Sequence, residues 1–305
     1  MSFLINTMRM GNSGESDPYW SSVSALLHMD GVNGGTTFIE QKGKTTTPIG
    51  SVNTSSTQVK FGSASLASGL AGFTASRATT VLTVTAITYG TITVGMQITD
   101  QSTNGIVGII TSLGTGTGGT GTYNMNTSGT IASHVMIGAG YVGVADSADF
   151  QFGTGDFTIE GWFYIVGTVS QTQSIASYGK STFTTANDVG WRILLVGSKI
   201  YGSFFNGTTD QGIQGTTTLS QNTWYYFKYY KVSGVTYLNL NGTQEATATK
   251  NVSVNAPGTS WGLRIGSSTA DNSSFPLQGY VDDIRITKGV GRTGTTVPTS
   301  AFPNS

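Results

Sequence analysis

The chain has 305 residues, 37% of them hydrophobic, and can therefore bury the core of one large domain or two ordinary ones. Fifteen basic residues balance fifteen acidic ones, so no basic excess supports binding to nucleic acid or to an anionic membrane. Cysteine is absent, which excludes disulfides and thiolate metal sites. The 43 glycines and the 10% of aromatic residues favour many short strands joined by tight turns.

Residues 1–19 show no clean hydrophobic period and are predicted to form an N-terminal arm. They contain no charged region followed by a long apolar stretch, so we expect no secretory signal. No apolar run in the chain is long enough to span a bilayer. A disordered tail would expose apolar side chains without a partner. We therefore favour docking of the arm onto another protein, through Phe3, Leu4, Ile5, Met8 and Met10.

The first elements along the chain are predicted to be strands. Trp20–Met29 is followed by Asp30-Gly31, which indicates a strand entering a turn. From residue 72 to 137 the composition shifts to Thr, Gly, Val and Ile. Gly114–Thr122 lacks the following helix and the lysine of a phosphate-binding loop, so we interpret it as a long flexible turn. The shift predicts a small inserted β domain, with strands at Val81–Ile87, Gln97–Thr99, Gly105–Leu113 and Gly121–Met125.

Alternation with a period of two dominates the rest of the chain. Asp156–Val166 carries bulky side chains on both faces, which is typical of a central strand with partners on each side. Asn222–Lys231 has mostly aromatic faces and is interpreted in the same way. Asn241-Gly242 tolerates positive φ at both central turn positions and predicts a hairpin between Val235–Leu240 and Thr243–Thr249. Further strands are expected at Gly190–Val196, Lys199–Phe205, Ser260–Ile265 and Gln278–Thr287.

Several segments carry a resemblance to a known family: Ala25–Gly31 (ALLHMDG), Val59–Leu66 (VKFGSASL), Tyr141–Trp162 (YVGVADSADFQFGTGDFTIEGW) and Gly279–Lys288 (GYVDDIRITK) with Arg292. They resemble the laminin-G-like, concanavalin A-type jelly roll that is common in bacteriophage virion proteins. In that family the FGSASL-type strand leads directly into the GTGDFTIEGW block, whereas roughly seventy residues intervene here. The intervening segment resembles a small β module of phage tail and capsid-associated proteins.

The resemblance implies an all-β fold. We expect a laminin-G-like β-sandwich (jelly roll) at residues 20–71 and 138–305, an inserted small β domain at 72–137 and the arm at 1–19. It further implies a non-enzymatic bacteriophage structural protein on the particle surface, a capsid- or tail-attached decoration or fibre component with a lectin-like domain.

Its partners would be other virion proteins, bound through the arm, and further copies of itself in a homo-oligomer such as a trimer. Neither nucleic acid nor membrane insertion is expected. Two alternatives stay open, a receptor-binding protein that recognises host glycans and a glycosidase.

The carboxylates form no recognisable catalytic pattern. A glycosidase needs two of them, about 5–9.5 Å apart, and glucanases of this fold supply them in a Glu-x-Asp-x-x-Glu run that is absent here. Asp282 and Asp283 are adjacent and would point to opposite faces of a strand. His28 and His134 cannot be linked to a serine or an aspartate by spacing. We therefore expect no enzyme.

Asp282 has two interpretations. In the first, it accepts hydrogen bonds from backbone N–H groups or pairs with Arg285 or Arg292, because buried charges need partners. In the second, Asp282 and Asp30 bind Ca²⁺ together with nearby carbonyl groups, where the first and last strands meet. Laminin-G-like domains often carry calcium, so the resemblance implies Ca²⁺ as an optional ion; no cofactor is required.

A carbohydrate site is expected between Tyr178 and Gln214, where two loops flank two strands. Sugar binding needs exposed aromatic faces together with planar amide or carboxylate groups. In the alternative, which we prefer for any single residue, the rings belong to the core and the polar residues form turns. The candidates are Tyr178, Asn187, Trp191, Tyr201, Phe205, Asn206 and Asp210.

Overall fold

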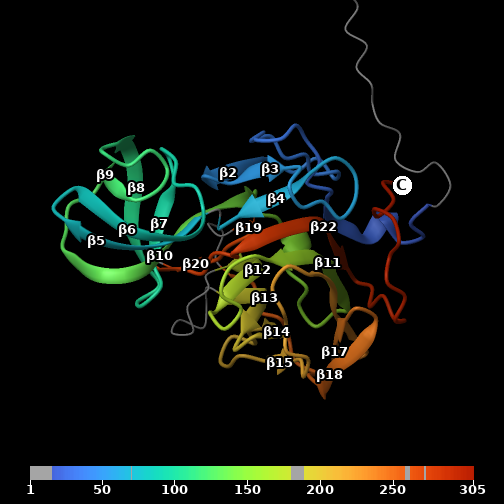
Figure 1. Ribbon diagram of the computed structural model, residues 1–305. Helices are drawn as coiled ribbons and strands as arrows, with labels where there is room; N and C mark the ends of the chain where they lie inside the picture. Colours follow the sequence, from blue (N-terminus) through green and yellow to red (C-terminus); the bar gives the residue numbers. More distant parts are fainter. Residues whose placement is uncertain (1–15, 70, 180–188, 258–261, 271–272) are drawn as a thin grey trace, which may run out of the picture.

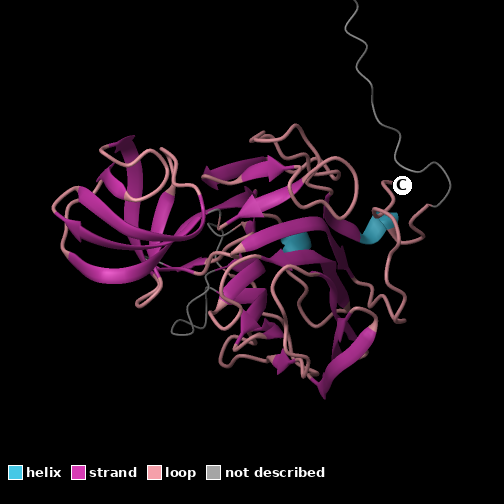
Figure 2. Cartoon of the chain, viewed as in Figure 1, coloured by secondary structure: helices cyan, strands magenta, loops and turns pink. Residues whose placement is uncertain are grey.

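The computed structural model describes residues 16–69, 71–179, 189–257, 262–270 and 273–305. Strands make up almost all of its regular structure (Figure 1 and Figure 2), which confirms the predicted all-β fold class. Among the described residues, no helix is both long and apolar enough to cross a membrane. The short 3-10 helices are η1 (Trp20–Ser22) and η2 (Ala148–Phe150).

The strands up to the end of the inserted segment are β1 (Val23–Leu27), β2 (Thr46–Gly50), β3 (Asn53–Ser55), β4 (Ser65–Ser68), β5 (Ala71–Ala78), β6 (Val81–Gly90), β7 (Gln97–Asp100), β8 (Gly105–Leu113), β9 (Gly121–Met125) and β10 (Ile131–Val144). Those that follow are β11 (Phe157–Ile165), β12 (Gln173–Gly179), β13 (Val189–Val196), β14 (Lys199–Phe204), β15 (Ile213–Gln214), β16 (Trp224–Val232), β17 (Val235–Leu240), β18 (Thr243–Thr249), β19 (Leu263–Ile265), β20 (Thr269–Ala270), β21 (Ser273–Ser274) and β22 (Gly279–Lys288).

Two antiparallel sheets form a β-sandwich. The first, called sheet A, has the order β18-β17-β16-β11-β22-β4-β3, and β1 also pairs with β22. The second, called sheet B, runs β15-β14-β13-β12-β19-β10, with β2 on the far side of β10. The predicted central strand β11 lies between β16 and β22, and all nine of its residues are buried.

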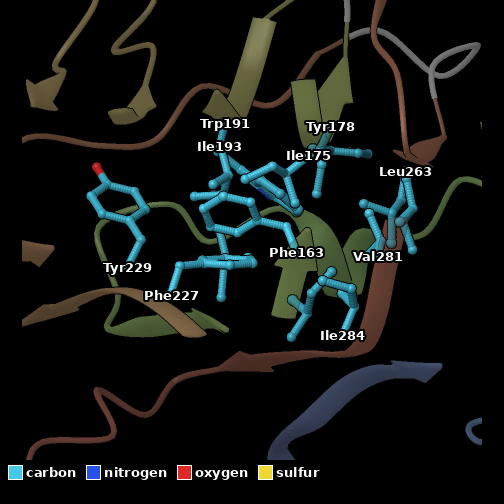
Figure 3. Close-up of a cluster of buried hydrophobic side chains, with 14 of the residues drawn as sticks. Phe163, Ile175, Tyr178, Trp191, Ile193, Phe227, Tyr229, Leu263, Val281 and Ile284 are labelled. Carbon is cyan, nitrogen blue, oxygen red and sulfur yellow. The ribbon is translucent and has the colours of Figure 1, made fainter. Parts of the chain in front are cut away.

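Alternation along the strands fills the space between the two sheets with apolar side chains. Phe163 of β11 and Phe227 of β16 meet Ile175 and Ile193 of sheet B (Figure 3). Gly161 interrupts the apolar face of β11, because a Cβ there would lie 2.4 Å from Cδ1 of Ile284 on the neighbouring strand. The sandwich therefore buries an aromatic-rich core between its two sheets, and the removal of these side chains from water is the main force that holds it together.

The predicted hairpin is confirmed, and several strands with buried residues were not predicted. Asn241 and Gly242 have φ values of 47° and 81° between β17 and β18, as a two-residue turn requires. The missed strands include β5, β10 and β12; the sequence of β12, QSIASYG, carries mostly small side chains and shows little hydrophobic alternation. Of the range predicted for β19, residues 260 and 261 lie outside the described residues.

A separate barrel is attached to the sandwich, at the left in Figure 1. Strands β5, β6, β9, β8, β7 and β10 each pair with the next, and β10 pairs with both β5 and β7, so the sheet closes. The barrel has its own apolar core. The run between β8 and β9 folds over Tyr123, whose hydroxyl accepts from Gly118 N–H and donates to the Gly119 carbonyl.

Strand β10 belongs to both parts of the molecule. Residues 131–139 pair with β5 and β7 inside the barrel, and residues 140–144 pair with β2 and β19 in sheet B. The chain thus leaves the sandwich after β4 and returns to it along one continuous strand.

Candidate functional site

The structure places the predicted sugar-binding rings inside the sandwich. Tyr178 and Trp191 are fully buried (Figure 3), and Phe205 is only 5% exposed. Trp191 packs against Phe152 with ring centroids 5.8 Å apart. These three rings offer no face to a ligand, which corrects the expectation that they stack on a sugar and favours the alternative of core packing.

The predicted polar residues of this region are divided between a turn and an ion pair. The side-chain oxygen of Asn206 accepts from the N–H groups of Thr208 and Thr209, as in an ordinary Asx turn. Tyr201 donates its hydroxyl to Oδ2 of Asp210 at 2.7 Å, and Arg192 donates to the same oxygen at 2.7 Å. Asn187 lies outside the described residues.

The Arg192–Asp210 pair belongs to the outer face of sheet B, the face turned away from sheet A. Cross-strand partners across this face are Thr47, Gly143, Arg264, Ser177, Arg192 and Ser203. Five of them alternate with core residues on their own strands, and Thr47 is paired with Gly143, so all six face outward. The outer face of sheet B therefore carries a row of hydroxyl and guanidinium groups.

A groove of about 340 Å³ opens at the β2 end of this row. Its residues include Thr47, Tyr141, Asp146 and Arg264, and the guanidinium of Arg264 lies 5.6 Å from the centre of the Tyr141 ring. Gly143 forms part of the floor, where the missing side chain leaves space. The groove thus combines an aromatic ring, a cation, a hydroxyl and an exposed carboxylate.

Sequence reasoning missed the groove, although one signal pointed to it. In the segment Tyr141–Val144, Val142 and Val144 belong to the core, so Tyr141 and Gly143 must face the other way. The partners that complete the groove come from β2 and β19, and their pairing with β10 is not visible in the sequence.

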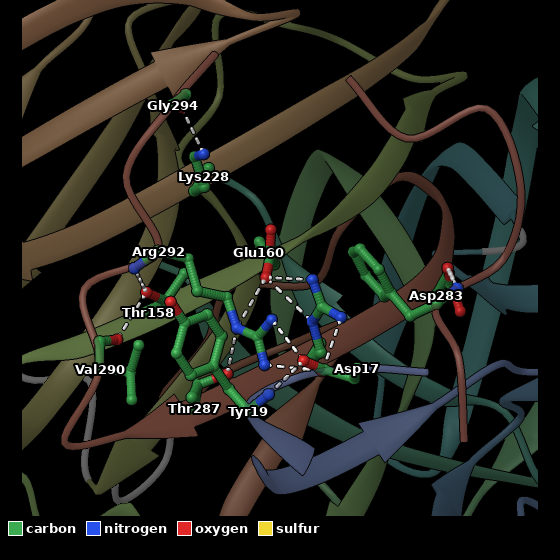
Figure 4. Close-up of polar contacts among 12 residues, drawn as sticks. Asp17, Tyr19, Thr158, Glu160, Lys228, Asp283, Thr287, Val290, Arg292 and Gly294 are labelled. Carbon is green, nitrogen blue, oxygen red and sulfur yellow. Dashed lines mark hydrogen bonds and ion pairs between the residues drawn. The ribbon is translucent and has the colours of Figure 1, made fainter. Parts of the chain in front are cut away.

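The outer face of sheet A carries a different arrangement, a cluster of buried charges (Figure 4). Asp17 accepts hydrogen bonds from Arg285 at 3.0 Å and from both terminal nitrogens of Arg292 at 2.9 and 2.7 Å. Glu160 accepts two hydrogen bonds from Arg285, at 3.0 and 2.8 Å, and one from the Tyr226 hydroxyl. These bonds fasten the segment around Asp17 and the chain after β22 onto the sheet.

The charges in this cluster shift the pKa values of its members. Burial by itself raises the pKa of Asp17, but hydrogen bonds from Arg292 and Tyr19 and the positive charge of Arg285 outweigh burial and lower it. Burial and the charge of Glu160 raise the pKa of Tyr226 well above its usual value, so its hydroxyl stays a donor. Asp17 is therefore a stable anion at neutral pH.

Comparison with protein families decides the class of the sandwich. Residues 138–291, just over half of the chain, match the laminin-G-type family described as the concanavalin A-like lectin/glucanases superfamily. The chain belongs to this family. No curated protein matches it.

The solved structures that resemble this chain share little sequence identity with it. One is the binding domain of Paraclostridial Mosquitocidal Protein 1, at 10% identity and a TM-score of 0.47, covering 90% of this chain and 50% of that chain. Another is the Ruminococcus gnavus IT-sialidase CBM40 bound to alpha2,3 sialyllactose, at 12% identity and a TM-score of 0.39, covering 46% of this chain and 78% of that chain. The chain spans about half the length of the first of these.

The calcium site that the laminin-G resemblance implies does not fit the residues present. Oδ2 of Asp282 accepts from the N–H groups of Lys60 and Phe61, and Oδ1 of Asp30 accepts from Ser63. Burial and the nearby charges of Asp283 and Asp30 raise the pKa of Asp282 well above its usual value. Within the described residues, no three His, Cys, Asp or Glu side chains gather around a common point.

Asp282 keeps part of its predicted structural role. It accepts from backbone N–H groups as expected, but Arg285 and Arg292 pair with Asp17 and Glu160 instead of with Asp282. The expectation that Asp282 and Asp283 point to opposite faces is also corrected. A bulge with φ of 50° at Asp283 turns both carboxyl groups toward the segments that cover sheet A.

Both histidines of this concanavalin-type chain have aspartate partners that their spacing did not reveal. Nδ1 of His28 lies 2.5 Å from Asp283, and Nδ1 of His134 lies 2.9 Å from Asp100. Ser102 also contacts Nδ1 of His134, at 3.0 Å. A catalytic triad uses the two ring nitrogens for different partners, so the contacts at His134 do not form one.

Proposed function

We propose that this protein is a non-enzymatic carbohydrate-binding module whose site is the groove on the outer face of sheet B. The observation that carries the proposal is the set of groups gathered in one hollow: the Tyr141 ring, the Arg264 guanidinium, the Thr47 hydroxyl and the Asp146 carboxylate. An aromatic ring packs against the C–H face of a sugar, and polar groups around it bind hydroxyls. Membership of a lectin and glucanase superfamily supports the same function.

Catalysis is not part of the proposal. Glycoside hydrolysis needs two carboxylates on either side of the scissile bond. The described lining of the groove contains one, Asp146, which also accepts a hydrogen bond from Tyr178 at 2.8 Å. The buried Asp282 and Asp283 side chains are at most 1% exposed and cannot reach a polysaccharide.

A glycan array probed with the full chain tests this function. We expect binding to a subset of bacterial surface polysaccharides, and at least a tenfold loss of affinity in Tyr141→Ala, because a stacked ring contributes about 1 kcal/mol or more. Tyr237→Ala removes a tyrosine from the outer face of sheet A and should bind as the wild type does. The proposal would be overturned if the wild type bound no glycan on the array, or if Tyr141→Ala bound as tightly as the wild type. Release of reducing ends from a polysaccharide would show that the protein is an enzyme.

We further propose that the module is displayed on a bacteriophage particle, either as a decoration or fibre component or as the receptor-binding protein itself. The segments Tyr141–Trp162 and Gly279–Lys288, with their resemblance to phage virion proteins, support this part. The apolar arm residues Phe3, Leu4, Ile5, Met8 and Met10, which lie outside the described residues, are the proposed attachment segment. Purified particles should contain the protein, and a chain lacking residues 1–15 should be lost from them; retention of the shortened chain would argue against attachment by the arm.

A further inference from the structure

A second hollow lies on the side of the sandwich opposite the groove, against the outer face of sheet A. It encloses about 320 Å³, within the size range of small-ligand sites. Glu160, Lys228 and Arg285 line it from the sheet, and residues 291–298 and Tyr19 line it from the covering segments. Its floor is thus the charged cluster described above, seen in Figure 4.

The charges around this hollow do not balance. Three cations, Lys228, Arg285 and Arg292, face two carboxylates, Asp17 and Glu160. Both arginines are paired with these carboxylates. The remaining positive charge belongs to Lys228, and a buried charge is costly unless it is paired.

Lys228 is the group that lacks a counter-charge. It is only 5% exposed, and its Nζ donates to the carbonyl oxygen of Gly294 at 2.5 Å. Glu160 sits directly opposite on β11, but its oxygens accept from Arg285 and Tyr226, and no carboxylate in the described part of the chain forms an ion pair with Lys228. Burial lowers the pKa of Lys228, although the charge of Glu160 opposes this.

We propose that this hollow binds a small hydroxylated carboxylate, such as a uronic acid, with its carboxylate paired to Lys228. A charge-assisted hydrogen bond is strong, and it gains further in a site of low dielectric constant. At the rim, the exposed Thr293 and Thr296 supply hydroxyl groups, and the 45% exposed Tyr19 supplies a ring. This site is independent of the groove, so either can exist without the other.

Calorimetric titration of the full chain with sodium glucuronate tests the proposal, with glucose as the neutral control. Glucuronate should bind and raise the unfolding temperature, and glucose at the same concentration should do neither. Lys228→Met should weaken glucuronate binding at least tenfold, whereas Lys228→Arg, which keeps the charge, should retain it. Lys231→Met removes another buried ammonium group from the same strand and should leave the affinity unchanged.

The variants also separate the two hollows. Equal affinity of Lys228→Met and the wild type, or no response to glucuronate at all, would overturn the proposal. A response lost in Arg264→Met but kept in Lys228→Met would assign the ligand to the groove and would also overturn it. Should Lys228→Met fail to fold, Thr296→Val replaces it, and this variant must bind glucuronate more weakly than the wild type.

Discussion

The charged cluster on sheet A and the groove on sheet B treat charge in opposite ways. On sheet A, Asp17, Glu160 and Arg285 are less than 10% exposed and are bonded to one another beneath the chain's own covering segments. On sheet B, Tyr141 and Arg264 are partly exposed beside an exposed Asp146 in an open groove. Similar residue types are thus enclosed and bonded to one another in the sheet A cluster and lie at the surface in the groove.

A large loss of stability is expected from Asp17→Ala, which would disrupt the sheet A cluster. The change removes the carboxylate that accepts two hydrogen bonds from Arg292, whose remaining ion-pair partner is Glu160 at 3.7 Å, and breaking a buried pair costs about 3–5 kcal/mol. Urea denaturation measures this as a fall in the free energy of unfolding. As a control, Asp149→Ala removes an exposed partner of Lys44 and should cost less than about 1 kcal/mol.

The pKa of Asp17 also predicts that the protein loses stability in acid. Because the pKa of Asp17 is lowered on folding, its contribution is fully present above the ordinary value of 3.8 and is lost as the pH falls through the lower folded value. The wild type should therefore lose stability below about pH 4, and Asp17→Ala should lose less in this range. Parallel acid curves for the two proteins would contradict this role.

A smaller, local effect is expected at His28, which holds the C-terminal tail to sheet A through Asp283. Burial lowers the pKa of His28, but the hydrogen bond and charge of Asp283 outweigh burial and raise it above 6.5. The stabilisation is complete below pH 6.5 and is lost as the pH rises through the folded pKa.

Hydrogen exchange at the amide of Phe302, which donates to Asp283 at 2.7 Å, reports this loss. After correction for the intrinsic rate, protection should fall as the pH rises above 6.5, by about tenfold for each unit by which the pKa is raised. His28→Gln should remove this pH dependence. If the protection of the Phe302 amide in the wild type did not change with pH, the proposed role of His28 in holding the C-terminal tail would be wrong.

The smallest effect on stability is expected in the groove. Tyr141→Ala removes a partly exposed ring and should change the free energy of unfolding by less than about 1 kcal/mol. Trp191→Ala empties a fully buried site and should cost about 3–5 kcal/mol. Thermal or urea unfolding of the two variants tests this contrast, and a large loss in Tyr141→Ala would mean that the groove is part of the structural core.

Local patterns in the sequence predicted many of the strands, missed β5, β10 and β12, and assigned faces poorly. The alternation in β11 and β16 and the Asn241-Gly242 turn gave the centre of sheet A and its hairpin. Trp191 was a candidate ligand contact, yet it shares a period-two face with the buried Ile193 and Leu195. Alternation shows which residues lie together, whereas the identity of the buried face depends on the sheet that packs against it.

Long-range contacts could not be predicted from a single chain. Asp17 and Arg292 are separated by 275 positions, and nothing in their neighbourhoods shows that they meet. The groove likewise depends on the pairing of β2, β10 and β19, which come from distant parts of the sequence. The bulge that turns Asp283 overrides the strand alternation from which the faces of the two aspartates were inferred.

Strand β10 has a mechanical consequence. Its first part is hydrogen-bonded into the barrel and its last part into sheet B, without a linker between them. A load applied to the barrel would pass along this backbone and be carried in shear by the hydrogen bonds that border the groove, since Tyr141 and Gly143 lie on the same strand. A force on the barrel would therefore be transmitted directly to the groove through this continuous strand.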